Sequence, residues 1–78
     1  MRIESSPAAR RLVRSRGGTL YLTLEGVSTD PPREPIDVDG FDGGGYLLVL
    51  DRRLERPAGV RVEVVDGALR VEPRPRSR

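Results

Sequence analysis

Hydrophobic and polar side chains alternate along residues 19–25, Thr-Leu-Tyr-Leu-Thr-Leu-Glu. Because successive side chains of an extended chain point to opposite faces, Leu20, Leu22 and Leu24 share one face. Tyr21 lies on the opposite face with two threonines and a glutamate. The pattern predicts a half-buried β-strand over residues 19–25.

A second strand is predicted over residues 46–50, Tyr-Leu-Leu-Val-Leu. This segment is hydrophobic on both faces, which is typical of the centre of a sheet. The other elements predicted around it are a proline-containing loop over residues 28–35, a short edge strand over 36–39, a flexible glycine-rich turn over 40–45, and one capped helical turn over 51–56.

A β-hairpin is predicted from residues 60–65 and 68–72, joined by Asp66-Gly67. Asp-Gly is typical of a two-residue type I′ turn, and such a turn fixes the register of its strands. Hydrophobic residues then face each other on one side, Val64 opposite Leu69 and Val62 opposite Val71. On the other side we expect cross-strand charge pairs, namely Glu63 with Arg70 and Arg61 with Glu72.

A short helix is predicted over residues 6–17, with Ser6 as its N-cap, Pro7 at its first position and Gly17 at its end. Its hydrophobic stripe is Ala8, Ala9, Leu12 and Val13. A helix of about ten residues is unstable alone, so we expect it to pack on the sheet.

These elements predict a β-rich α+β fold, in which the N-terminal helix packs on a mostly antiparallel sheet of four to five strands that ends in the hairpin. One domain is expected over residues 1–73, followed by a disordered tail over 74–78. The predicted core is Leu12, Val13, Leu20, Leu22, Leu24, Ile36, Val38, Leu48, Leu50, Val62, Val64, Leu69 and Val71. A core this small gives modest stability, so dimerisation through the Tyr46 strand or an exposed sheet edge is expected to help.

The composition excludes several kinds of chemistry. Among the 78 residues there is no Lys, His, Cys, Trp, Asn or Gln. Histidine bases, thiolate nucleophiles, Schiff-base lysines and zinc sites are therefore excluded, and no group remains to activate the serines or threonines. We expect no enzymatic activity, no cofactor and no small-molecule substrate.

The charges are unevenly distributed. Residues 1–16 carry five arginines and one glutamate, a net +4; residues 17–50 carry one arginine and six acids, a net −5; residues 51–78 carry eight arginines and five acids, a net +3. Two explanations remain open: the domain pairs its own basic ends with its acidic middle, or the ends bind an acidic partner. The all-arginine basicity fits either a bidentate binding role or GC-rich coding.

The aspartates between residues 37 and 42 fit neither a calcium loop nor a phosphate site. Asp37, Asp39 and Asp42 resemble a calcium loop, but Phe41 stands at the fifth position and Leu48 at the twelfth, where the loop needs oxygen ligands. The same stretch is a poor phosphate site, since it contains no basic residue. A polar turn is the better interpretation, and no metal site is predicted.

Six residues are candidates for binding a partner. Tyr21 is exposed on its strand, and Phe41 is expected at the tip of the glycine-rich turn, where an aromatic side chain suits an anchor. The alternatives for these two are an ordinary solvated sheet surface and a cover for the core. The full set is Arg10, Arg11, Arg14, Tyr21, Phe41 and Tyr46.

The order of elements resembles a known family. The helix Ser-Pro-Ala-Ala-Arg-Arg-Leu-Val-Arg leads through Gly17-Gly18 into residues 19–24, and an acidic loop, the strand Tyr46–Asp51, a helical turn and a hairpin follow. This arrangement resembles the HesB-like fold of A-type iron–sulfur carriers, in particular cysteine-free relatives, between residues 6 and 73. The resemblance implies a β-rich fold and a protein partner, with cluster binding lost, and it transfers no site residues.

The function predicted from the sequence is a non-catalytic protein–protein interaction module or accessory subunit, with a protein partner or a homodimer. The alternative is a nucleic-acid-associated protein that uses the arginines of the helix and of residues 74–78. Since no hydrophobic run is long enough to cross a bilayer and no signal-peptide core follows Met1, we expect a soluble, cytoplasmic bacterial protein without membrane contact.

Overall fold

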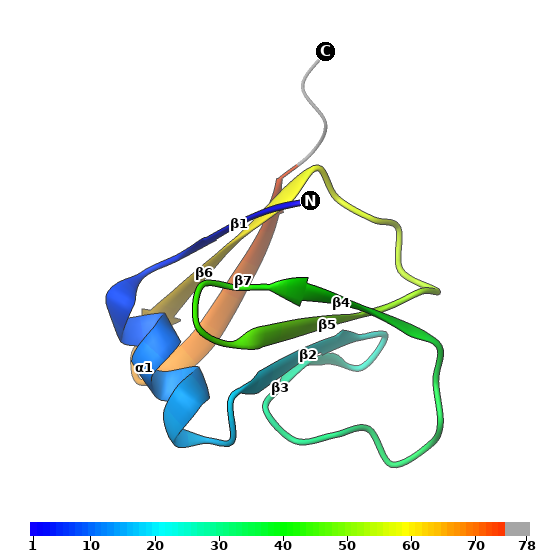
Figure 1. Ribbon diagram of the computed structural model, residues 1–78, viewed down its shortest axis with the longest axis horizontal. Helices are drawn as coiled ribbons and strands as arrows, with labels where there is room; N and C mark the ends of the chain where they lie inside the picture. The colour runs from blue at the N-terminus through cyan, green and yellow to red at the C-terminus, as the bar shows by residue number, and fades with distance from the viewer. Residues whose placement is uncertain (75–78) are drawn as a thin grey trace.

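A computed structural model describes residues 1–74 of the chain. Within this range, one helix and seven strands form two mixed sheets (Figure 1). The elements are β1 (Arg2–Ser5), α1 (Pro7–Ser15), β2 (Thr19–Thr23), β3 (Gly26–Ser28), β4 (Val38–Asp42), β5 (Leu47–Asp51), β6 (Gly59–Val65) and β7 (Ala68–Arg74).

The strand-rich α+β class is confirmed, but the prediction of a single sheet of four to five strands is wrong, because the seven strands of residues 1–74 form two sheets with mixed pairing. The strand orders are β1-β6-β7 and β3-β2-β5-β4, and the pairs β1–β6 and β2–β5 are parallel. The additional strand β1 was not predicted, because only Ile3 is hydrophobic in its Arg-Ile-Glu-Ser sequence. Its pairing with β6 joins residues that are distant in the sequence, and no local pattern indicates such a pairing.

The terminal hairpin matches its prediction in both turn and register. Val64 lies opposite Leu69 and Val62 opposite Val71. Asp66 and Gly67 both have positive φ, 52° and 78°, as a type I′ turn requires.

The predicted charge pairs across this hairpin are corrected. The ion pairs run along each strand, from Arg61 to Glu63 and from Arg70 to Glu72 (Nη2–Oε1 3.1 Å). Residues i and i+2 lie on the same face of a strand, about 6.6 Å apart, which the flexible arginine side chain spans easily.

The first predicted strand ends two residues early. After Thr23 the chain reverses through Leu24 and Glu25, and Gly26 begins β3 with a φ of 120°. Leu24 therefore leaves the core face and is 57% exposed. The predicted burial of Leu24 is wrong because the strand stops before the alternation does.

The glycine-rich turn predicted over residues 40–45 is also corrected. Gly40, Phe41 and Asp42 belong to β4, which pairs antiparallel with β5. The turn is confined to Gly43–Gly45, called the glycine loop below. The predicted edge strand therefore exists but begins and ends later, and Val38 is exposed on it.

The helical turn predicted over residues 51–56 does not form. Asp51 is the last residue of β5, and its carboxylate accepts the Arg53 backbone N–H at 2.9 Å. The Leu54 N–H donates to the Asp51 carbonyl at 3.0 Å, so the chain makes one tight turn and then runs extended. A carboxylate that bonds its own backbone two residues on favours this turn over a helix.

Helix α1 has the predicted N-cap. The Ser6 hydroxyl accepts the Ala9 N–H at 3.1 Å, and Pro7 occupies the first position. At the other end, Gly17 and Gly18 have φ of 117° and 87°, and the Gly18 N–H donates to the Val13 carbonyl. The helix lies across one end of the molecule, where it contacts β6 and β2 (Figure 1).

The hydrophobic core lies between the two sheets and α1. Of the predicted core, five residues are only half-buried, namely Leu12, Ile36, Val64, Leu69 and Val71, and Leu24 and Val38 are exposed. The fully or nearly fully buried hydrophobic residues are Ala9, Val13, Leu20, Leu22, Tyr46, Leu48, Val49, Leu50, Val60 and Val62. Of the tail predicted over 74–78, Arg74 is the last residue of β7, and residues 75–78 lie outside the described range.

Candidate partner-binding surface

A hollow lies on the face of the β3-β2-β5-β4 sheet that points away from the core. Strand register places Tyr21 and Thr23 of β2 on this face. Residues 29–37, which join β3 to β4 and are called the proline loop below, cover the face incompletely. The remaining space is a cleft of about 600 Å³, called the outer cleft, with Tyr21, Thr23, β3, the proline loop and Arg53 around it.

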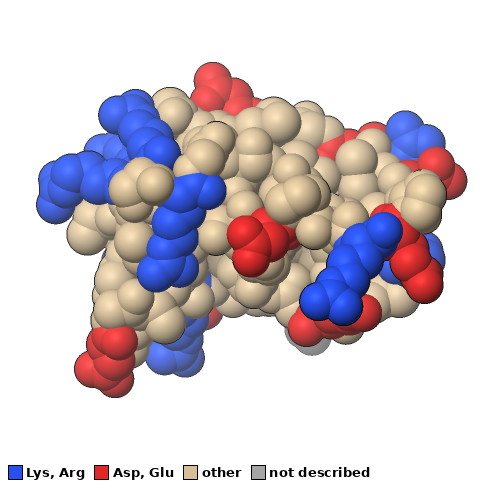
Figure 2. All heavy atoms as spheres, turned by 90° about the horizontal axis from the view of Figure 1, so that it is seen from below, with Lys and Arg blue, Asp and Glu red and all other residues tan. Residues whose placement is uncertain are grey.

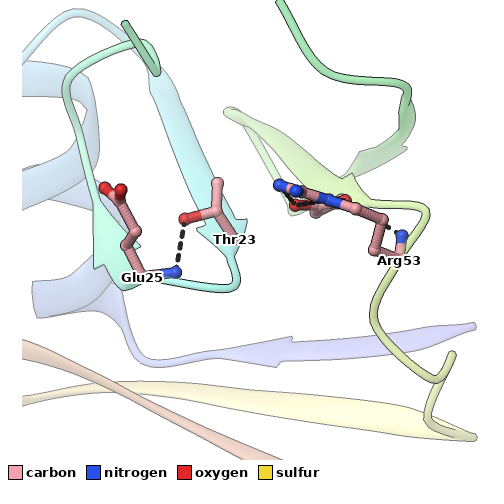
Figure 3. Close-up of polar contacts among 4 residues, drawn as sticks. Thr23, Glu25 and Arg53 are labelled. Carbon is pink, nitrogen blue, oxygen red and sulfur yellow. Dashed lines mark hydrogen bonds and ion pairs between the residues drawn. The ribbon is translucent and has the colours of Figure 1, made fainter. Parts of the chain in front are cut away.

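Two hydrogen bonds between residues close in the sequence stabilise the wall of the outer cleft that β2 and β3 form. The Thr23 hydroxyl accepts the Glu25 N–H at 3.2 Å in the turn between the strands. The Ser28 hydroxyl accepts the Asp30 N–H at 3.0 Å where the proline loop begins. Side-chain oxygens that bond the backbone two residues on stabilise such turns. Figure 3 shows Glu25 and Arg53 on the two sides of Thr23.

The opposite wall is held by an ion pair with a buried carboxylate. The Arg53 guanidinium donates to both carboxylate oxygens of Asp51, through Nε at 3.0 and 3.1 Å and through Nη2 at 2.7 Å. The Asp51 side chain is completely buried, whereas that of Arg53 is 57% exposed. Such a bidentate pair fixes the direction of the guanidinium.

This ion pair changes the pKa of both groups. Hydrogen bonds from the Arg53 side chain and then from its backbone N–H lower the pKa of Asp51 from 3.8 to about 2, and they outweigh the effect of burial. The pKa of Arg53 is raised, first by the hydrogen bond to Asp51 and further by the nearby charges of Glu34 and Glu25. Asp51 is therefore ionised at neutral pH and neutralises the guanidinium at the cleft wall.

The outer cleft has an excess of negative charge. It is lined by three exposed carboxylates, Glu25, Asp30 and Glu34, and by Arg33 and Arg53. None of the three carboxylates takes part in an ion pair within residues 1–74. Because Asp51 already neutralises Arg53, Arg33 is the one remaining cation that opposes them.

Helix α1 has the opposite charge. Its arginines and that of its C-cap are Arg10, Arg11, Arg14 and Arg16, and the helix contains no acidic residue. No ion pair in the described part of the chain involves them. Figure 2 shows arginine side chains gathered over the end of the molecule formed by α1. The helix therefore does not pair with the acidic middle of the chain.

Two of these arginines lie against the glycine loop. The Arg14 Nε donates to the Gly45 carbonyl at 3.0 Å, and a Cβ on Gly45 would lie 1.8 Å from an Arg14 nitrogen. The Arg10 side chain passes within 3.5 Å of the position that a Cβ on Gly44 would take. Arg14 thus has a structural contact, and Arg11 is left pointing to solvent.

Tyr46 is not available to a partner, contrary to the prediction. Its side chain is only 6% exposed, and its hydroxyl lies 2.6 Å from the Ser5 hydroxyl. Since Ser5 donates to the Gly43 carbonyl at 3.2 Å, the Tyr46 hydroxyl donates to Ser5. Burial raises the pKa of Tyr46, and the Ser5 hydrogen bond and the Arg10 charge partly offset that rise.

Phe41 is on strand β4 and not at a loop tip. It packs half-buried against the core, and the Arg56 guanidinium carbon lies 5.1 Å from its ring centre. Phe41 therefore covers the core.

Two arginines share one carboxylate beside Phe41. Asp39 accepts hydrogen bonds from both Arg52 Nε (3.1 Å) and Arg56 Nη2 (2.9 Å). Partial burial acts to raise the pKa of Asp39, but the Arg52 and Arg56 hydrogen bonds lower it overall.

Comparison with known proteins identifies no relative of this chain. No family model, no curated protein and no solved structure matches the chain. The resemblance to HesB-like domains thus stays a prediction. Residues 1–74 contain no cluster of three or more Asp, Glu, His or Cys side chains able to hold a metal ion, and no helix long and hydrophobic enough to cross a membrane.

Of the six predicted partner-binding residues, Tyr21 alone lines the outer cleft, while Arg11 is exposed on the helix. Four further residues of this site were not predicted from the sequence, namely Thr23, Glu25, Glu34 and Arg53. The available signal was Glu25-Gly26 directly after a hydrophobic run, which is typical of a chain reversal.

Proposed function

We propose that the protein is a non-catalytic protein–protein interaction module that binds a partner protein in the outer cleft. One observation carries the proposal: the cleft is open, and the hydrogen-bonded β2–β3 turn and the Asp51–Arg53 ion pair hold its walls in place. Preformed walls reduce the ordering that binding requires, and this favours affinity. Tyr21 on the cleft floor is the aromatic contact of the kind that dominates protein interfaces.

The residue chemistry of the cleft supports binding over catalysis. Its charged groups are carboxylates and guanidiniums, and the buried carboxylate of Asp51 behind it is fully engaged by Arg53. A guanidinium does not release a proton at any ordinary pH, so this pair performs no acid–base step.

The test uses the full chain isolated from its source cell with a mild affinity tag and measured by native mass spectrometry. We expect a complex with a second protein molecule, which is either a different protein or, at about millimolar concentration, another copy of the chain. Tyr21→Ala, which removes the ring from the cleft floor, should abolish this complex. Thr19→Ala is the matched control, because Thr19 lies on the same sheet face but outside the cleft. A monomer with neither another protein nor a second copy bound, or equal loss with both variants, contradicts the proposal.

A second candidate function is nucleic-acid binding by α1, favoured by the four arginines that no carboxylate of residues 1–74 pairs with. Phosphate contacts release counterions, so affinity for a DNA or RNA duplex should fall linearly on a plot of log K against log salt. Arg11→Ser should reduce this slope by about 1. A duplex that does not bind at about 50 mM salt removes this candidate.

A further inference from the structure

Helix α1 and the outer cleft carry opposite charges that do not pair within one molecule. The four arginines of α1 and its C-cap form no ion pair among the described residues, and neither do Glu25 and Glu34 of the cleft. The helix lies at one end of the longest axis, and the turn between β2 and β3 lies well away from it, toward the opposite side (Figure 1). The molecule extends 34 Å along this axis, and charges on it that are farther apart than about 8 Å are largely screened from one another at physiological salt.

We infer that the outer cleft binds helix α1 of a second copy of this chain, with Arg11 of one copy placed between Glu25 and Glu34 of the next. The inference rests on the proposed function, in that it takes the cleft to be a protein-binding site. It names the partner as this chain itself. A basic segment of another protein is the competing occupant.

The exposed face of α1 has a suitable shape. Ala8, Arg11 and Ser15 follow one another at helical spacing, and all three are exposed. Because Ala8 and Ser15 are small, the helix backbone approaches a surface closely while Arg11 projects from it. An amphipathic helix that enters a groove is a common mode of protein recognition.

The cleft has complementary features. Glu25 and Glu34 come from different segments, yet both lie near enough to Arg53 to raise its pKa. Leu24 and Val27, which also line the cleft, are 57% and 42% exposed and offer hydrophobic contact to the helix. An incoming guanidinium meets two carboxylates that have no ion-pair partner within residues 1–74, since Asp51 neutralises Arg53.

The geometry of this contact determines the kind of assembly. The helix and the cleft are different surfaces, so the contact is heterologous, and a pair of copies retains one unoccupied helix on one copy and one unoccupied cleft on the other. Association therefore produces open chains of molecules and no closed dimer. Since exposed ion pairs contribute little each, we expect a dissociation constant on the order of 0.1–1 mM at low salt.

The test is sedimentation equilibrium of the purified chain at about 20 mM and about 500 mM salt. At low salt we expect the average mass to rise continuously with protein concentration, and at high salt we expect a monomer. Arg11→Glu and Glu34→Arg should each weaken association about tenfold, because each places like charges together. The controls Arg70→Glu and Glu55→Arg change the net charge equally, outside the helix and the cleft, and should leave association unchanged.

Mixing the two variants gives the sharpest result. The Arg11→Glu chain keeps an intact cleft and the Glu34→Arg chain keeps an intact helix, so an equimolar mixture should associate at low salt more strongly than either variant alone, through one unchanged contact and one contact in which both charges are exchanged. A monomer at every salt concentration, or association that both variants leave unchanged, overturns the inference. If Tyr21 still binds a different protein in the source cell, the proposed function stands although the inference has failed.

Discussion

The glycine loop and the proline loop are both loops beside β4, but the fold holds them in different ways. The glycine loop is held on several sides: Gly43 accepts the Ser5 hydroxyl, Gly45 accepts Arg14, and the Gly43 N–H bonds the Tyr46 carbonyl. The proline loop has hydrogen bonds at its two ends, where Asp30 bonds Ser28 and the Arg52 N–H bonds Asp37.

This difference separates structural residues from residues available for binding. The predicted partner residues Arg10, Arg14 and Tyr46 lie around the glycine loop, and their contacts hold α1 and β1 against the β4–β5 connection. The proline loop covers the opposite side of the sheet incompletely and borders the outer cleft. A connection with few internal bonds is more readily adjusted to a partner.

The largest expected effect comes from the glycine-loop side. Tyr46→Ala should lower the free energy of unfolding by about 3–5 kcal/mol, because it removes a buried aromatic ring from the core. Urea unfolding followed by circular dichroism measures the change. Tyr46→Phe keeps the ring and loses the hydrogen bond to Ser5, so it should lower stability by about 1 kcal/mol. A loss below 1 kcal/mol for Tyr46→Ala would show that this side is not structural.

On the cleft side, the corresponding test is the response to acid. The pKa of Asp51 is about 2 in the folded chain against an ordinary 3.8, so the folded state binds its proton more weakly than the unfolded state. The stability from Asp51 is therefore full above about pH 4 and is lost as the pH falls towards 2. Unfolding free energies measured across this window should show the fall, and Asp51→Asn should flatten it. An equal slope in the variant would contradict the assignment.

A smaller effect is expected when a methyl group is added to the glycine loop. A Cβ on Gly43 would lie 2.4 Å from the Tyr46 ring, so Gly43→Ala forces the ring or the loop to move. We expect a loss of about 1–3 kcal/mol, as is typical of overpacking. The control in the other loop, Pro32→Ala, alters an exposed residue and should change stability by no more than about 0.5 kcal/mol. Similar values for both variants would remove the contrast between the loops.

The smallest effect concerns one surface hydrogen bond. Arg14→Ala removes the bond to the Gly45 carbonyl, which water then replaces, so the loss should be about 0.5–1 kcal/mol. The Gly43 amide should then exchange its hydrogen about two to five times faster, measured by NMR. Arg11→Ala is the matched control, since Arg11 is exposed on the same helix and forms no hydrogen bond to the glycine loop within residues 1–74. Equal rates in wild type and Arg14→Ala would show that Arg14 does not hold the loop.

Local rules were sufficient for some of the fold. Asp66-Gly67 determines its own turn and with it the hairpin register, and Ser6-Pro7 determines the start of α1. Both depend on residues within a few positions of each other. The predicted cross-strand ion pairs of the hairpin were wrong, because the Cα register does not determine which neighbouring carboxylate an arginine side chain contacts.

The remainder depended on contacts between distant residues. Gly40 and Phe41 were expected in a turn, but β5 provides a neighbouring strand that extends β4 through them. Phe41 and Tyr46 were expected at a surface, and each is covered by segments that the local sequence does not specify. The outer cleft combines residues from three segments, so the sequence pattern indicated no more than Tyr21 on its floor.

The parallel pairing of β1 with β6 also constrains the kinetics of folding. Arg2 lies opposite Gly59, so strand β1 can pair only after the distant segment around Gly59 has come beside it. Closing so long a stretch of chain is slow, and proteins dominated by such pairings fold in milliseconds to seconds. The β1-β6-β7 sheet is therefore expected to form only once residues 59–65 are available, and the β6–β7 hairpin, whose paired residues are close in the sequence, is expected to form first.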